Sequence, residues 1–268
     1  MAESDAEHER ILEMIKIGEP EQVQRNLEFL IDTELVQDVE TVASIRKYYE
    51  NRDPGTGPGA SRPQPGGPGR VDRRLLFDNG EKLTYAFLEE PPGELAAAVE
   101  TATAEWMQHA NVVFELTDDV SAALIRIQPS NRNTSVIGRH ALVVPSDEPT
   151  MHLVAREDYD ETELAAVIHE FGHALGMVHE HQNPRSQIAW DIDQAYRYFT
   201  QRFGYSAEWV DRNLLARSEV YPCVRDFDPS SIMMFSIPPE VTLDRADLGG
   251  ATELSASDKR CVASMYPK

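Results

Sequence analysis

Apolar positions along the chain follow two different periods. Up to residue 53 they recur three and four residues apart, and the same spacing returns over residues 94–109. This period is typical of amphipathic helices. Short alternating or continuous apolar runs elsewhere predict strands. The predicted strands are LTYAFL (83–88), NVVFEL (111–116), ALIRIQ (123–128) and TMHLVA (150–155).

Helical periods dominate after the last predicted strand. Asp160 and Glu163 form a capping-box pattern ahead of an apolar run, which predicts a helix that begins near residue 161. The other predicted helices are 191–203, 207–216 and one that Ser255 and Asp258 cap and that ends near residue 266. Because the strands precede most of the helices, the pattern indicates an α+β fold.

A stretch rich in glycine and proline divides the chain. Residues 54–69 contain six Gly and five Pro, a composition that disfavours regular structure and is typical of a linker. We therefore predict an N-terminal helical segment (1–53), a Pro/Gly-rich linker (54–71) and a main domain (72–268).

The charge balance argues against several classes of partner. The chain has 25 Lys and Arg against 46 Asp and Glu, and its net charge of −21 repels nucleic acid and anionic membrane surfaces. No window approaches the roughly 18 apolar residues of a membrane span, and the acidic amino terminus lacks the pattern of a secretory leader. We expect no nucleic-acid partner, no membrane span, and a protein that is cytoplasmic or exported without a visible signal peptide.

Four of the eight histidines fall within HEFGHALGMVHEH, residues 169–181. His169 and His173 lie four residues apart on the predicted helix, so both imidazoles face one point. Gly176 can end that helix in a left-handed turn, after which His179 can approach the same point from below the helix. Three imidazoles with an open fourth position suit a catalytic zinc site, so we predict one bound Zn²⁺ ion.

Glu170 projects beside the two helical histidines. A bound zinc ion lowers the pKa of its water to about 7, and a neighbouring carboxylate can take the proton as a general base. We expect Glu170 to have that role and then to protonate the leaving amine. The metal ligands and this base together predict a hydrolysis that uses a metal-activated water.

The motif HEFGHALGMVH (169–179) resembles that of the metzincin metallopeptidases. Within the metzincins the sequence resembles the astacin group, because Glu180 follows the third histidine. DPSSIMMFS (228–236) is similar to that group's Met-turn pattern, Ser-x-Met-x-Tyr. The likeness extends loosely from about residue 75 to the end of the chain. It implies a metzincin-type zincin domain: a twisted, mostly parallel mixed sheet over the active-site helix, and a smaller irregular C-terminal half. Met233 would then form a hydrophobic floor under the zinc.

Two positions raise questions within the astacin pattern. Phe235 stands where the family has a tyrosine that can bind zinc and hydrogen-bond the oxyanion, and a phenyl ring cannot donate a hydrogen bond. In astacins, trimming releases an amino terminus that is buried near the glutamate. Nothing here marks such a cleavage site, so we expect Glu180 to accept a local donor instead. Both residues are predicted to lie around the ligands or along the cleft.

The resemblance also implies how a peptide could bind. TMHLVA is a candidate edge strand along which a peptide could lie by adding a strand, and His152 within it is expected at the surface. His181 is the histidine left without a ligand role, and we expect it to line the cleft or to face solvent.

The leading hypothesis is a zinc-dependent metalloendopeptidase that acts on peptide or protein substrates. The alternative is a catalytically weak or silent zinc-bound module that holds peptides in the cleft. Phe235 favours this alternative, and the intact Glu170 opposes it. A hydrolase of non-peptide amides also fits the motif.

Three roles are open to the N-terminal helical segment: it binds a partner, covers the cleft, or packs against the main domain. Latency through an upstream cysteine ligand is excluded, because the two cysteines are Cys223 and Cys261. For this pair we expect buried thiols, with a disulfide as the alternative, since sequence alone does not give their separation.

Overall fold

The computed structural model describes residues 73–218, 221–223 and 226–268, which belong to one compact unit spanning residues 68–268. The helices predicted within residues 1–53 and the linker of 54–71 lie outside the described residues, and the domain boundaries stay a prediction. Within the described ranges, no helix combines the length and the apolar character needed to cross a membrane.

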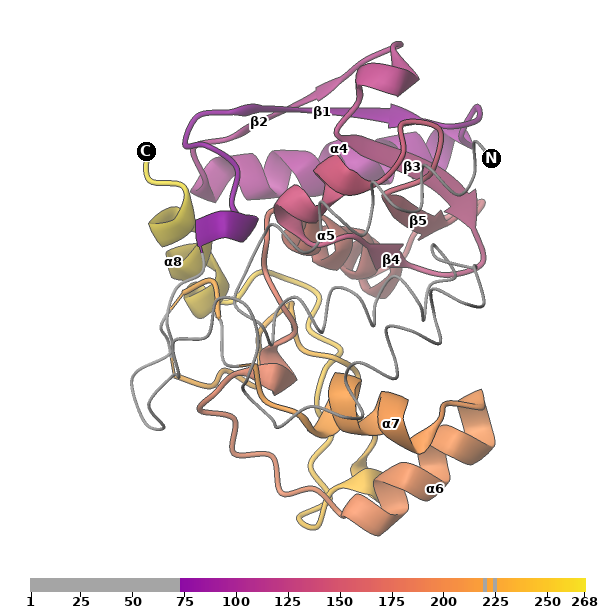
Figure 1. The fold of residues 1–268 in the computed structure, drawn as a ribbon, viewed down its shortest axis with the longest axis vertical. Helices are drawn as coiled ribbons and strands as arrows, with labels where there is room; N and C mark the ends of the chain where they lie inside the picture. Colours follow the sequence, from indigo (N-terminus) through magenta and orange to yellow (C-terminus); the bar gives the residue numbers. More distant parts are fainter. Residues whose placement is uncertain (1–72, 219–220, 224–225) are drawn as a thin grey trace, which may run out of the picture. The chain divides into compact units, whose positions relative to one another are not determined.

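A five-stranded sheet forms the upper part of the described chain (Figure 1). Its strands are β1 (Lys82–Phe87), β2 (Val113–Leu116), β3 (Ile125–Ser130), β4 (Thr134–Ser135) and β5 (Met151–Val154). They lie in the order β2-β1-β3-β5-β4. The pairs β1–β2, β1–β3 and β3–β5 are parallel, and β4 is antiparallel to β5. The mixed, mostly parallel sheet is confirmed.

The edge of this sheet differs from the prediction. TMHLVA forms β5, which is an inner strand, because Thr134 and Ser135 of β4 pair with His152 and Met151. The expectation that TMHLVA is the edge strand was therefore wrong. β4 has only two residues, both polar, so its segment shows no apolar period and reads as a loop.

Two helices cover the sheet and build the larger apolar core. They are α4 (Gly93–His109) and α5 (Glu161–Ala174). The indole of Trp106 on α4 donates to the carbonyl of Ile168 on α5 over 2.8 Å, and the ring of Phe171 makes edge-to-face contacts with Tyr85 and Phe114 of the sheet. The C-terminal helix α8 (Ala256–Met265) adds its apolar face to the same core.

Shorter elements make up the chain between α5 and α8. The helices are α6 (Ile192–Phe203) and α7 (Ala207–Val210), the latter continued by a π-helical turn, η5 (Asp211–Leu215). The 3-10 helices of the described chain are η1 (Arg73–Leu75), η2 (Val120–Ala122), η3 (Gly138–Val143), η4 (Glu180–Gln182) and η6 (Pro239–Val241). A second apolar cluster, with Phe199, Leu214 and Met234 among its members, holds this part together. The α+β fold with a smaller, irregular C-terminal half is confirmed.

Cys223 and Cys261 form a disulfide, with their Cα atoms 5.5 Å apart. The expectation of two buried thiols was therefore wrong. The pairing joins the loop before residue 228 to α8 across a separation of 38 residues, and only the folded chain brings these two segments together.

Candidate metal centre

The helix α5 begins and ends through local signals. The Asp160 side chain accepts the backbone N–H of Glu163, and the Glu163 side chain accepts that of Asp160, which is the predicted capping box. At the other end Gly176 has φ +95°, a left-handed conformation that disfavours residues with a Cβ. Its N–H bonds the carbonyl of His173, and that of Met177 bonds the carbonyl of Gly172, the pattern of a Schellman motif. The predicted turn is confirmed.

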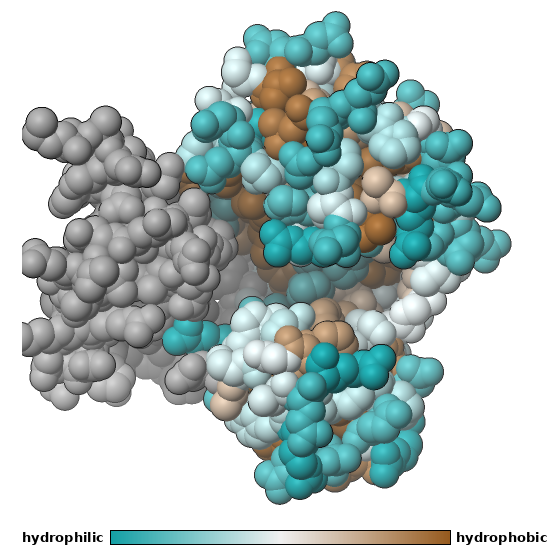
Figure 2. All heavy atoms as spheres, turned by 90° about the vertical axis from the view of Figure 1, so that its right-hand side faces the viewer, coloured by the Kyte–Doolittle hydropathy of each residue, from teal (hydrophilic) through white to brown (hydrophobic). Residues whose placement is uncertain are grey.

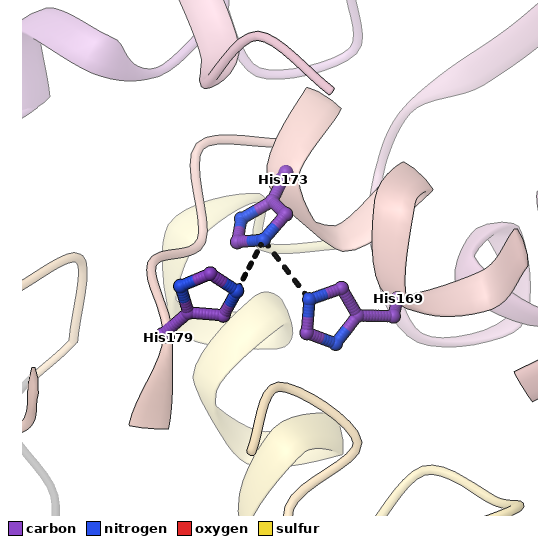
Figure 3. Close-up of side chains that lie close together, drawn as sticks. All are labelled: His169, His173 and His179. Carbon is purple, nitrogen blue, oxygen red and sulfur yellow. Dashed lines mark hydrogen bonds between the residues drawn. The ribbon is translucent and has the colours of Figure 1, made fainter. Parts of the chain in front are cut away.

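This reversal brings His179 back to the two histidines of α5 (Figure 3). Nε2 of His173 lies 3.0 Å from Nε2 of His169 and 3.2 Å from Nε2 of His179. Four ligands around a zinc ion at about 2.0–2.1 Å are roughly 3.3 Å apart in a tetrahedron. One ligand atom from each histidine lies within 4.8 Å of the others. The three side chains could therefore hold one metal ion.

Backbone carbonyls orient two of the three rings. Nδ1 of His169 lies 2.7 Å from the carbonyl oxygen of Ile232, and Nδ1 of His173 lies 2.8 Å from that of Met177. A carbonyl only accepts, so each Nδ1 carries the hydrogen and each Nε2 keeps its lone pair. Such a partner on the far nitrogen is typical of a metal-binding histidine.

Burial keeps the imidazole rings of the three histidines neutral. Burial lowers the pKa of His173 to about 3, with a further contribution from neighbouring His169. Burial also lowers the pKa of His169, and it holds that of His179 well below its usual range. Neutral imidazole is the form that binds a metal ion, so the three nitrogens are available as ligands at neutral pH.

Glu170 is buried beside its neighbour His169 on α5, with 6% of its surface exposed. Its Oε2 has no hydrogen-bond partner among the described residues. Burial raises the pKa of this carboxyl to about 8, because a charge is poorly solvated there. A bound cation nearby would favour the ionised form and so lower that pKa.

Met233 packs directly against α5 between the first two histidines. It is fully buried, and a Cβ placed on Gly172 would lie only 2.4 Å from its Sδ. The glycine therefore allows the sulfur to approach the helix backbone. The carbonyl of Met233 also accepts the N–H of Glu180, over 2.8 Å. The Met-turn thus contacts the helix that carries two histidines and the segment that carries the third.

A buried carboxylate holds the Met-turn in place. Asp258 of α8 accepts the hydroxyl of Ser231 over 2.6 Å and the N–H of Ile232 over 2.8 Å. The carbonyl of that same Ile232 accepts the Nδ1–H of His169. The sequence identified Asp258 only as part of a helix cap, which it also is. Its contact with residues 231 and 232 has no local signal, because 26 or 27 residues separate the partners.

Glu180 has internal hydrogen-bond donors, as expected. Its carboxylate is fully buried and accepts the side-chain amide of Asn183 over 2.9 Å, the N–H of Asp228 over 2.8 Å and the hydroxyl of Tyr221. These bonds tie η4 to the loop before the Met-turn. These internal donors account for the burial of the side chain.

His181 is buried, with 2% of its surface exposed, so the expectation that it faces solvent was wrong. Its ring centroid lies 5.2 Å from that of His179 and 5.5 Å from that of Phe235. Its Nε2 lies 2.7 Å from the carbonyl oxygen of Asn213 in η5. This turn of η5 covers the ring, and sequence spacing gave no sign of it. Burial lowers the pKa of His181 to about 4.

Phe235 stands beside the third ligand, with its ring centroid 5.6 Å from that of His179 and 6.4 Å from that of Phe199.

The space-filling view shows a groove between the part that contains the sheet and the part below it, with hydrophobic residues along its floor (Figure 2). The segment 169–181 includes the last turns of α5, which covers the sheet, and η4, the first element after α5. His152, which was predicted to lie at the surface of an edge strand, is partly buried in β5 and is not one of the three histidines that could hold a metal ion.

Comparisons with known proteins agree with this geometry. The family model described as Astacin, a family of peptidases, matches residues 77–267. A structure of myroilysin is similar at 33% identity and a TM-score of 0.68, over 74% of this chain and 98% of that chain. A crystal structure of myroilysin gives 33% identity and a TM-score of 0.57, over 72% and 86%.

A more distant match supports the fold alone. High choriolytic enzyme 1, a hatching-enzyme zinc protease from the medaka fish Oryzias latipes, is 15% identical, with a TM-score of 0.51 over 74% of this chain and 92% of that chain. No curated protein sequence gives a significant match. The match to the family model over most of the chain decides the matter: the chain belongs to the astacin family of zinc metallopeptidases.

Proposed function

We propose that this chain is a zinc-dependent metalloendopeptidase, with one zinc ion bound by His169, His173 and His179 and with Glu170 as the general base. One observation carries the proposal: three imidazole nitrogens converge, two of them from α5, and the same helix holds a buried carboxyl whose Oε2 has no hydrogen-bond partner among the described residues. The family supports a peptide or protein as substrate.

A zinc ion bound here would act as a Lewis acid, which lowers the pKa of the attacking water and polarises the scissile carbonyl. The side chains do the rest. His169 and His173 donate their Nδ1 hydrogens to backbone carbonyls, which leaves the lone pair of each Nε2 to bind the metal. Glu170 takes a proton from the attacking water while the water oxygen adds to the scissile carbonyl carbon. Glu170 then passes that proton to the leaving amine. Met233 keeps the floor of the site apolar.

A library of diverse peptides, incubated with the full chain with and without a zinc chelator, tests the activity. We expect cleavage that the chelator abolishes. Glu170→Gln should retain one zinc ion and lower kcat by about 10²- to 10⁴-fold, because it removes the proton acceptor. Glu161→Gln, an exposed residue in the first turn of the same helix, is the matched control and should cleave like the parent. Full turnover by Glu170→Gln would refute its assignment as the base.

The alternative, a weak or silent zinc-bound module that holds peptides, has Phe235 in its favour. The ring lies next to the third ligand but offers no donor for an oxyanion. We expect Phe235→Tyr to raise kcat, by up to about 10²-fold, if a donor is missing there. Peptides that bind the parent in a chelator-sensitive way without being cut would support the alternative. An unchanged rate in Phe235→Tyr would indicate that another group already provides the donor.

A further inference from the structure

Three buried side-chain polar atoms of the described chain lack a hydrogen-bond partner, and two of them belong to the segment 169–181. These two are Oε2 of Glu170 and Nδ1 of His181. Buried polar atoms are hydrogen-bonded in the great majority of cases, and an exception is typical of a group with a catalytic role or a water partner. The mechanism above uses the first atom and leaves the second without a role.

The ring of His181 lies between the third ligand and Phe235. Its centroid is 5.2 Å from that of His179, with the two planes tilted by 31°, and 5.5 Å from that of Phe235. It is not one of the converging ligands, so it lies just outside the group that would hold the metal.

Its hydrogen-bond pattern determines what it can offer there. Nε2 lies 2.7 Å from the carbonyl oxygen of Asn213, and a carbonyl only accepts, so Nε2 carries the hydrogen of the neutral ring. Nδ1 then has a lone pair and no hydrogen. His181 therefore cannot replace the missing tyrosine as a donor, and what it offers is an acceptor.

We propose that Nδ1 of His181 accepts a hydrogen bond from the water that this site activates. The inference rests on the proposed function. The water would then have two acceptors: Glu170 takes one of its protons, and His181 holds its other O–H bond, so that an oxygen lone pair faces the carbonyl under attack. No proton moves to His181 in this step: Nε2 keeps its hydrogen, and Nδ1 acts only as an acceptor.

Two substitutions separate this acceptor from the bond to Asn213. His181→Asn places an amide near the position of Nδ1, where its oxygen can accept, but does not reach Asn213. His181→Gln places its amide near the position of Nε2, where it can donate to Asn213, but leaves no acceptor at Nδ1. The control is Gln182→Ala, which removes a second, longer hydrogen bond to the same carbonyl and leaves the acceptor intact.

The first measurement follows the visible spectrum of the full chain loaded with Co²⁺ as a function of pH, and needs no catalysis. A hydrogen-bond acceptor beside the bound water stabilises water, which has two O–H bonds, more than hydroxide, which has one. Its loss should therefore move the spectral midpoint of His181→Gln to lower pH by about half a unit to one unit. His181→Asn and Gln182→Ala should stay closer to the parent.

The second measurement is peptide cleavage. In His181→Gln we expect kcat to fall roughly 3- to 10-fold with little change in KM, while His181→Asn retains more activity. Equal midpoints for parent and His181→Gln would overturn the proposal, and so would a larger loss in His181→Asn than in His181→Gln. A raised KM with unchanged kcat would overturn it too, since the acceptor would then serve the substrate. A parent that cleaves nothing refutes the proposed peptidase instead, and the cobalt titration still tests His181.

Discussion

The upper and lower parts of the described chain are stabilised in different ways. In the upper part, regular strands and the helices α4 and α5 bury apolar side chains in one large cluster. Between residue 180 and α8, five residues also belong to this large cluster (Tyr221, Cys223, Ile232, Met233 and Leu254), and the rest of the segment has a smaller apolar cluster of its own. Here the buried carboxylates of Glu180 and Asp258 bind backbone and side-chain donors, and a disulfide joins the loop to α8.

This difference matters because the metal centre draws on both parts. His169 and His173 come from α5, and their relative placement follows from the helix period. His179 and Met233 come from the irregular part, where directional hydrogen bonds rather than a regular backbone set the geometry. We therefore expect changes in the lower part to disturb metal binding more than equally destabilising changes in the upper part.

The largest expected effect concerns the disulfide. Replacing Cys223 and Cys261 together by serine opens the loop that the disulfide closes across a separation of 38 residues. The unfolded chain gains conformational entropy, so the free energy of unfolding should fall by about 4 kcal/mol. Denaturant unfolding of parent and variant under non-reducing conditions measures the difference. A difference near zero would show that the lower part is held by its hydrogen bonds alone.

Asp258→Ala and Leu83→Ala test the comparison directly. The first removes the carboxylate that holds residues 231 and 232, and the second opens a cavity in the fully buried core beside the sheet. Each should cost about 3 kcal/mol of unfolding free energy. Zinc affinity, measured by competition with a chelating dye, should fall about 10- to 100-fold only in Asp258→Ala. Equal losses of affinity would contradict the division between the two parts.

Gly172→Ala tests the contact between α5 and the Met-turn. Its Cβ would lie 2.4 Å from Sδ of Met233 and 3.0 Å from the ring of Trp106, and such overpacking should cost about 1–3 kcal/mol. Thermal unfolding measures the effect. Gly93→Ala is the control, because a Cβ there meets nothing within 4 Å. Matching stability in the two variants would show that Met233 can move away freely.

The smallest effect is expected for a polar pair of the upper part. Lys82 and Glu115 form an ion pair of 2.6 Å across β1 and β2, with about half of each side chain exposed. Solvent screens such pairs, so Lys82→Ala should change the unfolding free energy by less than about 1 kcal/mol. A larger loss would show that polar contacts stabilise both parts.

Local patterns account for the features that the sequence predicted correctly. Alternating and continuous apolar runs marked β1, β2, β3 and β5, and paired caps marked the first residues of α5 and α8. Each of these signals lies within one element or one turn. The convergence of His169, His173 and His179 was predictable for the same reason, since one helix face and one left-handed glycine determine it within a short stretch of chain.

The amino-acid sequence by itself thus determined the α+β class, the astacin-type motif and the three candidate ligands, because these depend on spacing between near neighbours in the chain. Only the tertiary structure decided that β4 forms the sheet edge, that the cysteines pair, that η5 covers His181 and that Asp258 holds the Met-turn. Each of these joins segments that are well separated along the chain, through a backbone group or a single side chain. Such contacts leave no periodic trace in the sequence, and they form only when packing brings the partners together.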